Sequence, residues 1–480
     1  MPDINLALML PEITIALVAM GLLLASAWWE GTAGVRRIRV IAAAGLILAM
    51  LMTMLSVGSE DTTTFGGMFV NDSFASYMKV MLYFATLLPL VISWEYLEKS
   101  SVGNGEYFVL SLFAALGGML MISSGDFIVL YLGIELMSLS VYVLAAYKRD
   151  NPASNEAGLK YFILGSMASG ILLYGISLIY GVTGGTSFAN VNEYLTHAGH
   201  LPTAMGVGVV MVLAGLAFKI AAAPFHMWAP DVYEGAPTSV TAFMAAMPKI
   251  AAFGALFRVL GDALGPMQDL WSPVLQLLAV LSMGVGAFAA LGQVNIKRLL
   301  AYSSIGHVGF ALIGLATGTE MGFQAVVVYL TIYVFMTVGT FALILAVNKE
   351  GIGDQIDDYK GLAQKRPGLA FLMAVFMFSM AGIPPLAGFI GKLQIFMAAV
   401  SSEMYTVAII GVLLSAISAY YYLRIIKTMF FDDAEREFDM EMSMITRSVL
   451  GLSSILILAW GIMPGSLLAW ASGSIQGFLG

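Results

Sequence analysis

The stretch that decides the fold of this chain is 204-AMGVGVVMVLAGLAFKIAAAPFHMWAPDVYEG-235. It opens as an apolar run of the kind that crosses a lipid bilayer as a helix, but it holds a charge, Lys219, well inside the run. Pro224 follows and removes a backbone donor, so we expect the helix to break there. An intramembrane charge beside a proline break is the pattern expected of an ion-transport site, here for small cations and above all protons.

Composition extends this interpretation to the whole chain. Of its 480 residues, 59% are hydrophobic and 11% are charged, with a mean hydropathy of +0.88. About fourteen segments reach the roughly 20 apolar residues that a spanning helix needs, and they are too continuously apolar for barrel strands. We therefore predict an all-α polytopic membrane protein with about 14 transmembrane helices in a single membrane domain over residues 1–480. The predicted spans are 4–29, 37–57, 74–94, 107–123, 126–147, 160–181, 204–235 (broken), 239–260, 272–292, 298–317, 322–347, 369–400 (broken), 404–430 and 446–471, with a short interfacial helix over 186–197.

Several classes of protein are excluded or receive no support. The chain has no cysteine, so disulfides, iron–sulfur clusters and cysteine-ligated metals are excluded within it. A net charge of -8 without a large basic patch gives no indication of nucleic-acid binding. Residues 1–29 begin without the positive region of a signal peptide, so we expect an uncleaved first helix.

The basic residues predict the orientation in the membrane. Alternate loops hold 16 of the 22 lysines and arginines, and the opposite loops are mainly acidic. The sixteen are Arg36, Arg37, Arg39, Lys99, Lys148, Arg149, Lys297, Arg298, Lys349, Lys360, Lys365, Arg366, Arg424, Lys427, Arg436 and Arg447, and the acids opposite are Glu60, Asp61, Asp72, Glu193, Asp262, Asp269 and Glu320. Lys79 and Arg258 are expected near the acidic face. The positive-inside rule then places both termini outside the cytoplasm, which agrees with an even number of spans.

A second proline break, 382-GIPPLAG-388, interrupts the twelfth predicted span. Because the two breaks are an odd number of spans apart, the units that contain them enter the membrane from opposite sides. We predict two inverted five-helix repeats, over 107–261 and 272–430, preceded by three helices in 1–106 and followed by a last helix in 431–480. Backbone carbonyls near both breaks should be free for water or ions.

Five ionisable residues lie in spans that otherwise appear buried in lipid. Glu135, Lys219, Lys249 and Lys392 fall near mid-depth, where each charge costs about 2.5–3.5 kcal/mol and is seldom kept without a use. Lys160 lies only a few residues into its span and could reach the interface. The alternative is a set of structural charges that pair with one another and hold the helices together.

Two histidines and a glycine cluster complete the candidates. His226 follows the first break and His307 lies near mid-span, and either could relay protons or simply hydrogen-bond a neighbour. Haem ligation by this pair is disfavoured, since no helix offers a second spaced pair. Gly284, Gly286 and Gly292 lie inside an apolar span with no strand before them, so close helix packing explains them better than a nucleotide loop.

The region 219-KIAAAPFHMWAPDVYEGAPTSVTAFMAAMPK-249 strongly resembles the signature of the antiporter-like subunits of respiratory complex I. The segments 160-KYFILGSMASGILLYG-175, 384-PPLAGFIGK-392 and 418-SAYYYLRIIKTMF-430 are most similar to the subunit N branch, and the similarity spans nearly the whole chain. The sister branch, subunit M, would be expected to carry glutamate where Lys392 stands.

The resemblance implies a proton channel. It assigns a Glu–Lys pair to Glu135 and Lys219, a central lysine to Lys249, an outlet lysine to Lys392, and a further channel lysine to Lys160. It implies no cofactor in this chain, because NAD, FMN, iron–sulfur clusters and quinone belong to partner subunits. The implied partners are other membrane subunits of complex I, including sister antiporter-like subunits, in the lipid bilayer of the bacterial inner membrane.

A buried lysine suggests how such a channel could work. Desolvation favours the neutral amine and a nearby carboxylate favours the ammonium, so moving Glu135 would turn Lys219 into a proton donor. The proton would then pass through ordered water to Lys249 and on to Lys392. Two alternatives stay open: a subunit of a sodium/proton antiporter, which sodium-dependent exchange would reveal, and a purely structural membrane subunit.

Overall fold

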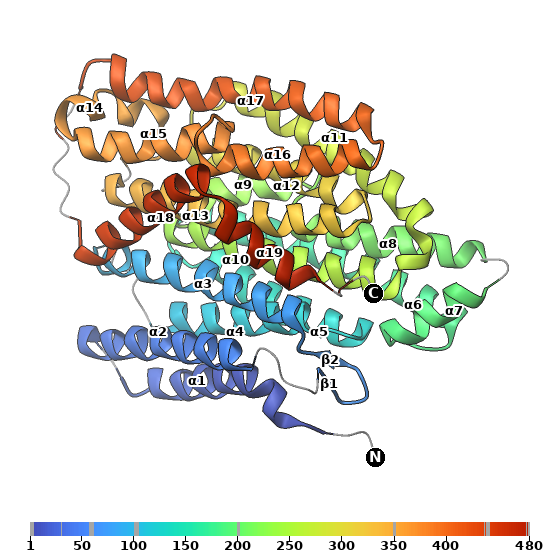
Figure 1. Cartoon of the computed structure of the whole chain (residues 1–480). Helices are drawn as coiled ribbons and strands as arrows, with labels where there is room; N and C mark the ends of the chain where they lie inside the picture. The colour runs from blue at the N-terminus through green and yellow to red at the C-terminus, as the bar shows by residue number, and fades with distance from the viewer. Residues whose placement is uncertain are drawn as a thin grey trace.

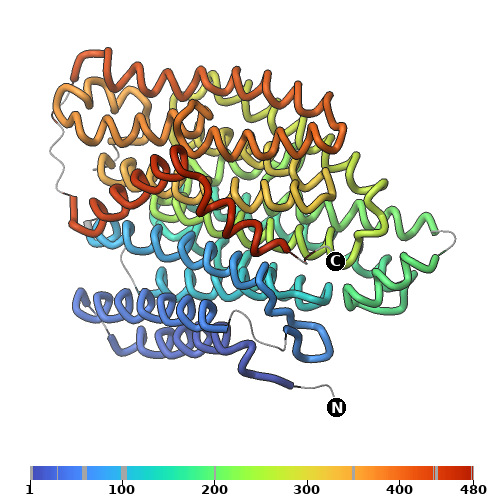
Figure 2. Tube along the Cα trace, in the orientation of Figure 1, coloured from blue at the N-terminus to red at the C-terminus, as the bar shows by residue number. Residues whose placement is uncertain are grey.

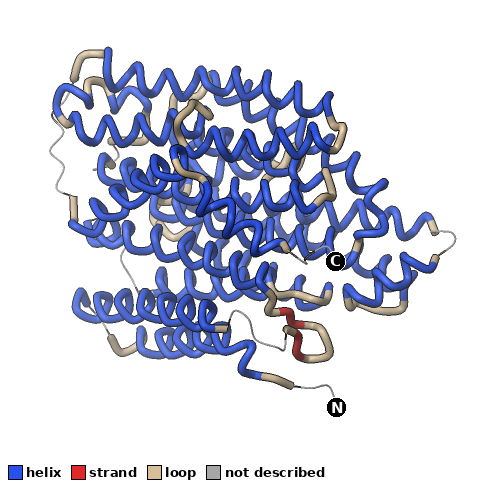
Figure 3. Tube along the Cα trace, viewed as in Figure 1, coloured by secondary structure: helices blue, strands red, loops and turns tan. Residues whose placement is uncertain are grey.

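The structure is a computed structural model that describes residues 4–29, 31–56, 62–99, 105–198, 202–348, 352–435, 437, 442–476 and 478. Four residues used to assign the orientation, Glu60, Asp61, Lys349 and Arg436, lie outside the described residues. Figure 3 shows a bundle made almost entirely of helices. The only strands among the described residues are the two-residue β1 (Thr63–Thr64) and β2 (Phe69–Val70), which pair antiparallel.

The helices follow the apolar segments of the sequence. In chain order they are α1 (Leu10–Ser26), α2 (Gly31–Leu55), α3 (Ser73–Lys99), α4 (Glu106–Ile122), α5 (Phe127–Ala145), α6 (Pro152–Thr183), α7 (Phe188–His197), α8 (Thr203–Ile220), α9 (Trp228–Gly235), α10 (Thr238–Arg258), α11 (Gln268–Leu291), α12 (Ile296–Ala316), α13 (Glu320–Val347), α14 (Leu362–Lys365), α15 (Pro367–Ala381), α16 (Ala387–Ser401), α17 (Tyr405–Phe431), α18 (Met444–Ile462) and α19 (Gly465–Ile475). Short turns of other helix types lie at Leu6–Met9, Val259–Ala263, Gly265–Met267 and Ile356–Tyr359.

The predicted fold class is confirmed. Twelve helices in the described part of the chain are long and apolar enough to cross a membrane. The shorter α4 and the α15–α16 pair add two more segments, so the fourteen predicted spans each have a counterpart.

Both predicted breaks are present. The first separates α8 from α9 and the second separates α15 from α16, and each contains a cis X-Pro bond. In both places the first half-helix ends on a residue with positive φ, Ala221 at 59° and Gly382 at 85°. The predicted helix over 186–197 is found as α7.

The last predicted span, 446–471, was wrong as a single helix. The structure divides it into α18, which ends at Ile462, and α19, which begins at Gly465. Pro464 lies between them and is the residue that cannot continue a helix, since it lacks a backbone donor.

Three helices form the centre of the bundle. The most apolar windows of α10, α12 and α13 are 100%, 94% and 94% buried inside the chain, whereas those of α1, α17 and α18 are 33% buried. Figures 1 and 2 show the N-terminal helices α1 to α3 on one side of this centre and α15 to α17 on the other. A group on α10, α12 or α13 is therefore shielded from lipid by other helices.

Ion pairs with a buried cation join the N-terminal helices to one another and to α10 at the centre. Lys79 on α3 is fully buried and pairs with Glu12 on α1 at 2.7 Å. Arg258, at the end of α10, pairs with Asp72 just before α3 at 2.6 Å and with Asp262 at 3.1 Å. Lys79 lies in the second turn of α3 and also donates to Asn71, just before that helix, at 3.3 Å. It is therefore close to the end of the bundle where it was expected, but other helices cover it.

Of the three glycines expected to serve helix packing, the structure supports Gly286 alone. A Cβ at Gly286 would lie 2.6 Å from the backbone nitrogen of Gly306, so α11 and α12 touch there. Gly284 and Gly292 have no atom within 4 Å of such a Cβ, so at those two positions the packing interpretation was wrong.

Candidate functional site

Lys219 is held in a pocket of hydroxyl groups. It lies in the last turn of α8 and is 4% exposed. Its Nζ donates to Ser138 Oγ at 2.8 Å, to Tyr142 OH at 3.3 Å and to Ser169 Oγ at 3.5 Å. Ser138 and Tyr142 come from α5 and Ser169 from α6, so three helices meet at this ammonium.

Glu135 is the neighbour of this pocket and not part of it. It lies one turn before Ser138 on α5, and its charge acts on Lys219. No ion pair joins Glu135 to Lys219 in the described part of the chain, and Glu135 Oε1 is buried without a hydrogen-bond partner. Glu135 is also only half-buried, because its face of α5 carries the exposed Leu132 and Leu139.

Lys249 lies on the fully enclosed helix α10 and is 3% exposed. Its Nζ has no hydrogen-bond partner within the protein and lies 5.6 Å from the ring centroid of Tyr333 on α13. Pro248 precedes it without breaking the helix. Unlike Lys219 and Lys392, Lys249 therefore has no hydrogen bond within the protein to stabilise its charge.

His307 connects the surroundings of Lys249 and Lys392. It is 4% exposed on α12, and the charges of both lysines act on it. Tyr329 OH lies 2.6 Å from Nδ1 and Tyr422 OH lies 3.1 Å from Nε2. The ring centroid of Tyr333, below Lys249, is 5.4 Å from that of the imidazole.

Lys392 closes the second break. It lies on α16 and is 5% exposed. Its Nζ donates to the carbonyls of Met380 and Ala381, both at 3.0 Å, and to Ser415 Oγ at 2.9 Å. These are last-turn carbonyls of α15, which carry the negative end of the helix dipole. The sequence predicted carbonyls free for water or ions at this break, whereas in the structure these two carbonyls accept hydrogen bonds from Lys392 of the same chain.

Lys160 differs from the other candidates, because it is 42% exposed. Its Nζ pairs with Glu156 at 2.7 Å and with Asp231 on α9 at 2.8 Å. Arg298 on α12 also pairs with Asp231, at 2.7 Å. Lys160 therefore belongs to a half-exposed ion network at one end of the bundle.

His226 lies in the connection between α8 and α9 and is partly exposed. Its Nδ1 is buried and has no hydrogen-bond partner, and its carbonyl accepts from the backbone nitrogen of Ala229. An apolar recess of about 140 Å³ opens beside this connection, lined among others by Phe218, Phe225 and Trp228. The structure does not bring His226 to the other candidates.

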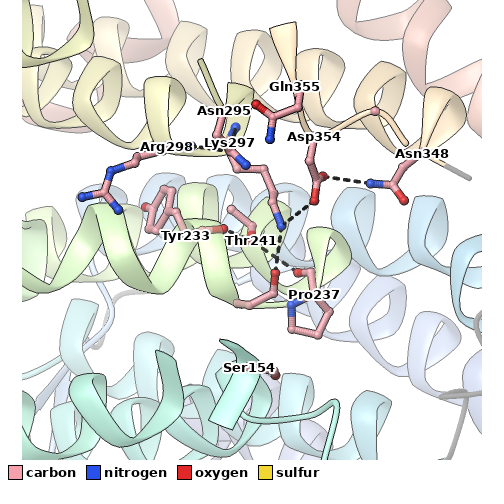
Figure 4. A network of polar contacts seen from close by, with 12 residues as sticks. Ser154, Tyr233, Pro237, Thr241, Asn295, Lys297, Arg298, Asn348, Asp354 and Gln355 are labelled. Carbon is pink, nitrogen blue, oxygen red and sulfur yellow. Dashed lines mark hydrogen bonds and ion pairs between the residues drawn. The ribbon is translucent and has the colours of Figure 1, made fainter. Parts of the chain in front are cut away.

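A second network surrounds Lys297 (Figure 4), which directly precedes Arg298 of the Lys160 network in the sequence. Lys297 was expected in a loop, yet it is 4% exposed. Its Nζ donates to the carbonyl of Ala236 at 3.2 Å and pairs with Asp354 at 3.4 Å. Asp354 also accepts from Asn348 at 2.9 Å. The network ties the turn between α9 and α10 to the loop that follows α13.

Several of these partners were missed by reasoning from the sequence. Glu135, Ser138 and Tyr142 lie three and then four residues apart, the spacing that places side chains on one helix face. Tyr329 and Tyr333 repeat the spacing on α13. That signal was available, but nothing in the sequence shows which lysine such a face meets. Among the described residues, no group of three His, Cys, Asp or Glu side chains could hold a metal ion.

Comparison with known proteins agrees with this geometry. Residues 124–418 match the family model described as "NADH:quinone oxidoreductase/Mrp antiporter, TM". The chain is 71% identical over 479 residues to NADH-quinone oxidoreductase subunit N of Magnetococcus marinus, covering 100% of this chain and 99% of the relative. It is 50% identical to the subunit N of Paramagnetospirillum magneticum, with 98% of each chain covered.

A solved structure supports the same family. A chain of respiratory complex I from Thermus thermophilus with bound aureothin superposes with a TM-score of 0.83 at 32% identity, covering 96% of this chain and 99% of that one. The second break, the buried lysines and the enclosed centre thus lie on a fold already seen in that complex. The chain therefore belongs to the subunit N family of NADH-quinone oxidoreductase, the proton-translocating, antiporter-like, multi-pass membrane subunits of bacterial respiratory complex I.

Proposed function

We propose that protons cross this subunit along a row formed by Glu135, Lys219, Lys249, His307 and Lys392. The observation that carries the proposal is the position of His307, whose imidazole meets a tyrosine hydroxyl at each nitrogen. The imidazole also contacts two aromatic rings, that of Tyr333 beside the Lys249 amine and that of Phe310 beside the Lys392 amine. Proton transfer needs groups that can both accept and release a proton, and imidazole, amine and hydroxyl all meet that need.

The chemistry of lysine suits this task. A buried ammonium without a carboxylate in contact is held by hydroxyls or carbonyls alone, as at Lys219 and Lys392. Such a group changes its protonation when a nearby charge moves, whereas a guanidinium would stay charged. Moving one proton against 100 mV requires roughly 2.3 kcal/mol. A two-unit change in the pKa of a carrier is worth about the same, at 1.36 kcal/mol per unit.

Ordered water would complete the row where side chains do not touch. Lys249 Nζ and Thr337 Oγ1 are both buried without a hydrogen-bond partner within the protein. Thr337 follows Tyr333 by one turn on α13, and Lys249 Nζ lies 5.6 Å from the Tyr333 ring centroid. Buried polar atoms of this kind are the usual ligands of internal water, so we propose that water joins Lys249 to its neighbours.

Lys160 is proposed as an entry residue and not as a mid-membrane carrier. Its ammonium is half-exposed and shares Asp231 with Arg298. The basic loops next to it put this end of the bundle in the cytoplasm under the positive-inside rule, with both termini on the other side. The start of α1 and the end of α19 lie at one end of the bundle, as this orientation requires (Figure 2).

The assembly follows from the family. The chain is a part of respiratory complex I with other subunits, and antiporter-like subunits carry no redox centre. We propose that NAD, FMN, iron–sulfur clusters and quinone act in the partners. Half-buried Glu135 supports a sister membrane subunit at that face, since a carboxylate at mid-depth is costly against lipid.

The test is proton pumping by inverted membrane vesicles that contain the complete complex. Lys219→Ala and Glu135→Ala should abolish or sharply reduce NADH-driven proton uptake without dispersing the assembly. Lys219→Arg should also impair it, because guanidinium does not release its proton. Full pumping by Lys219→Ala vesicles would overturn the proposal, and size-matched neutral replacements that pump normally would indicate purely structural charges.

A further inference from the structure

Tyr142 lines the Lys219 pocket but is not a member of the proposed proton row. It is 5% exposed, and its hydroxyl accepts from Lys219 Nζ at 3.3 Å. It lies on α5, two turns beyond Glu135, so the acid and the hydroxyl lie along one side of the same helix. The amine of Lys219 can therefore lie in either of two positions along α5, near the Glu135 carboxylate or near the Tyr142 hydroxyl.

Gly165 on α6 leaves the space that this hydroxyl occupies, because it has no side chain. A Cβ placed on Gly165 would lie 1.9 Å from the Tyr142 hydroxyl oxygen and 2.5 Å from Cζ, closer than real Cβ atoms approach. Any side chain at Gly165 would therefore force Tyr142 away from Lys219. Gly170, on the same helix, has no atom within 4 Å of an added Cβ.

Aromatic contacts join Tyr142 to the second half of the broken helix. Its ring packs edge-on against Tyr161 with centroids 4.7 Å apart. Tyr161 stacks on Trp228, the first residue of α9, at 4.1 Å and an interplanar angle of 8°. Trp228 Nε1 then donates to the carbonyl of Phe218, next to Lys219, at 3.0 Å. These contacts connect α9 both to Tyr142 and to the residue that precedes Lys219.

We propose that Tyr142 is a positioning residue that holds the Lys219 ammonium away from Glu135, and that α9 controls this hold through Trp228 and Tyr161. The inference rests on the proposed proton row. It adds the element that decides where the amine lies, because the hydroxyl contacts of Lys219 describe the disengaged position. When α9 moves the stack, Tyr142 releases the amine and Lys219 can approach the carboxylate.

The experiment compares the pumping of protons per NADH oxidised in inverted vesicles. Tyr142→Phe keeps the ring contact with Tyr161 and removes only the hydroxyl, and Gly165→Ala keeps the hydroxyl but displaces it. We expect each to lower pumping by about tenfold, the size of one hydrogen bond to a charged group. The matched controls are Gly170→Ala and Tyr107→Phe, a buried tyrosine whose hydroxyl lies 3.2 Å from Ser93. Both controls should pump within about twofold of the unmodified complex.

A double substitution separates positioning from packing. Glu135→Asp withdraws the carboxylate and favours the disengaged amine, whereas Tyr142→Phe favours the engaged one. The pair should therefore pump more than Glu135→Asp alone, while a tyrosine that only packs would lower pumping in both backgrounds. The amount of assembled complex is measured on native gels for every variant.

Two outcomes overturn the inference: Tyr142→Phe pumping at the level of its control, or the double substitution pumping less than Glu135→Asp. If Gly165→Ala fails to assemble, Tyr142→Phe and the double substitution still decide. Loss of pumping in Lys219→Ala together with normal pumping in Tyr142→Phe would reject this role and leave the proton row intact. Normal pumping in Lys219→Ala would reject the row itself.

Discussion

Lys392 caps the C-terminal end of α15, which lies eleven residues before it in the chain, because its Nζ donates to the carbonyl of Ala381 at 3.0 Å. The break leaves the last carbonyls of α15 without backbone partners, and the ammonium replaces the missing donors. The same amine is the last member of the proposed row. A proton that leaves Lys392 therefore also weakens the hold between α15 and α16, which joins charge to geometry at this break.

This relationship predicts the effect of a change that removes no ionisable group. Gly382 has a φ of 85°, and a Cβ there would lie 2.9 Å from Lys392 Cδ and 3.2 Å from Nζ. Gly382→Ala should therefore strain the turn and displace the amine, lowering NADH-driven proton uptake by about tenfold or more, as Lys392→Ala should. Gly368→Ala is the control, because Gly368 lies on α15, the helix that Gly382 caps, and has no atom within 4 Å of an added Cβ. Equal pumping by the Gly382 and Gly368 variants would contradict the link.

A second prediction concerns the hydroxyls around His307. Tyr329→Phe removes the group that lies 2.6 Å from Nδ1 and leaves the imidazole in place. If that hydroxyl passes protons, pumping should fall by about tenfold or more at unchanged assembly.

The matched control is Tyr77→Phe. Tyr77 OH lies 2.9 Å from Thr331 Oγ1, so this change removes a hydroxyl that also contacts α13 but lies away from the imidazole. Proton uptake is followed in inverted vesicles against the rate of NADH oxidation. Loss of pumping in both variants alike would show that α13 packing, and not the hydroxyl beside His307, is what matters.

Local features of the fold could be predicted because each depends on a short stretch of sequence. The spans follow from apolar length, and both breaks follow from Pro224 and from Pro384 with Pro385. The interruption at Pro464 carried the same signal, and reading 446–471 as one span ignored it. Depth along a helix could also be estimated, which is why Lys249 and Lys392 were expected inside the bundle and are found there.

The direction in which a side chain points around its helix could not be predicted in this way. Lys79 and Lys297 lie close to helix ends and were placed near membrane faces, yet both are buried because neighbouring helices cover them. Glu135 lies at mid-depth but faces partly outward. The partners of Lys219 come from α5 and α6, and their meeting depends on helix packing that no single segment encodes.

A third prediction concerns the network at Lys297. Lys297→Met keeps the apolar stem and removes the ammonium, which leaves the Ala236 carbonyl and Asp354 without their donor. Because Lys297 is 4% exposed, we expect a loss of about 1–3 kcal/mol, seen as a lower temperature of disassembly on native gels. Lys365→Met is the comparison, since Lys365 pairs with Glu437 at the surface and such pairs contribute about 0–1 kcal/mol. Equal thermal behaviour of the two variants would show that the Lys297 network does not hold the α9–α10 turn.

The fourth prediction concerns the buried pair that joins α1 to α3. Lys79 and Glu12 are 0% and 2% exposed and lie 2.7 Å apart. Lys79→Met leaves a buried carboxylate without its cation, and Glu12→Gln leaves a buried ammonium without its anion. Each should cost about 3–5 kcal/mol and reduce the amount of assembled complex.

The double variant Lys79→Met with Glu12→Gln removes both charges and should recover most of that loss, because no unpaired charge is then buried. Assembly is measured on native gels, and pumping is then normalised to the complex present. A structural pair predicts that the double variant pumps normally per assembled complex, since neither residue contacts the row from Lys219 to Lys392. Assembled double variant that cannot pump would instead place this pair in proton transfer, outside the segment 124–418 that matches the antiporter family model.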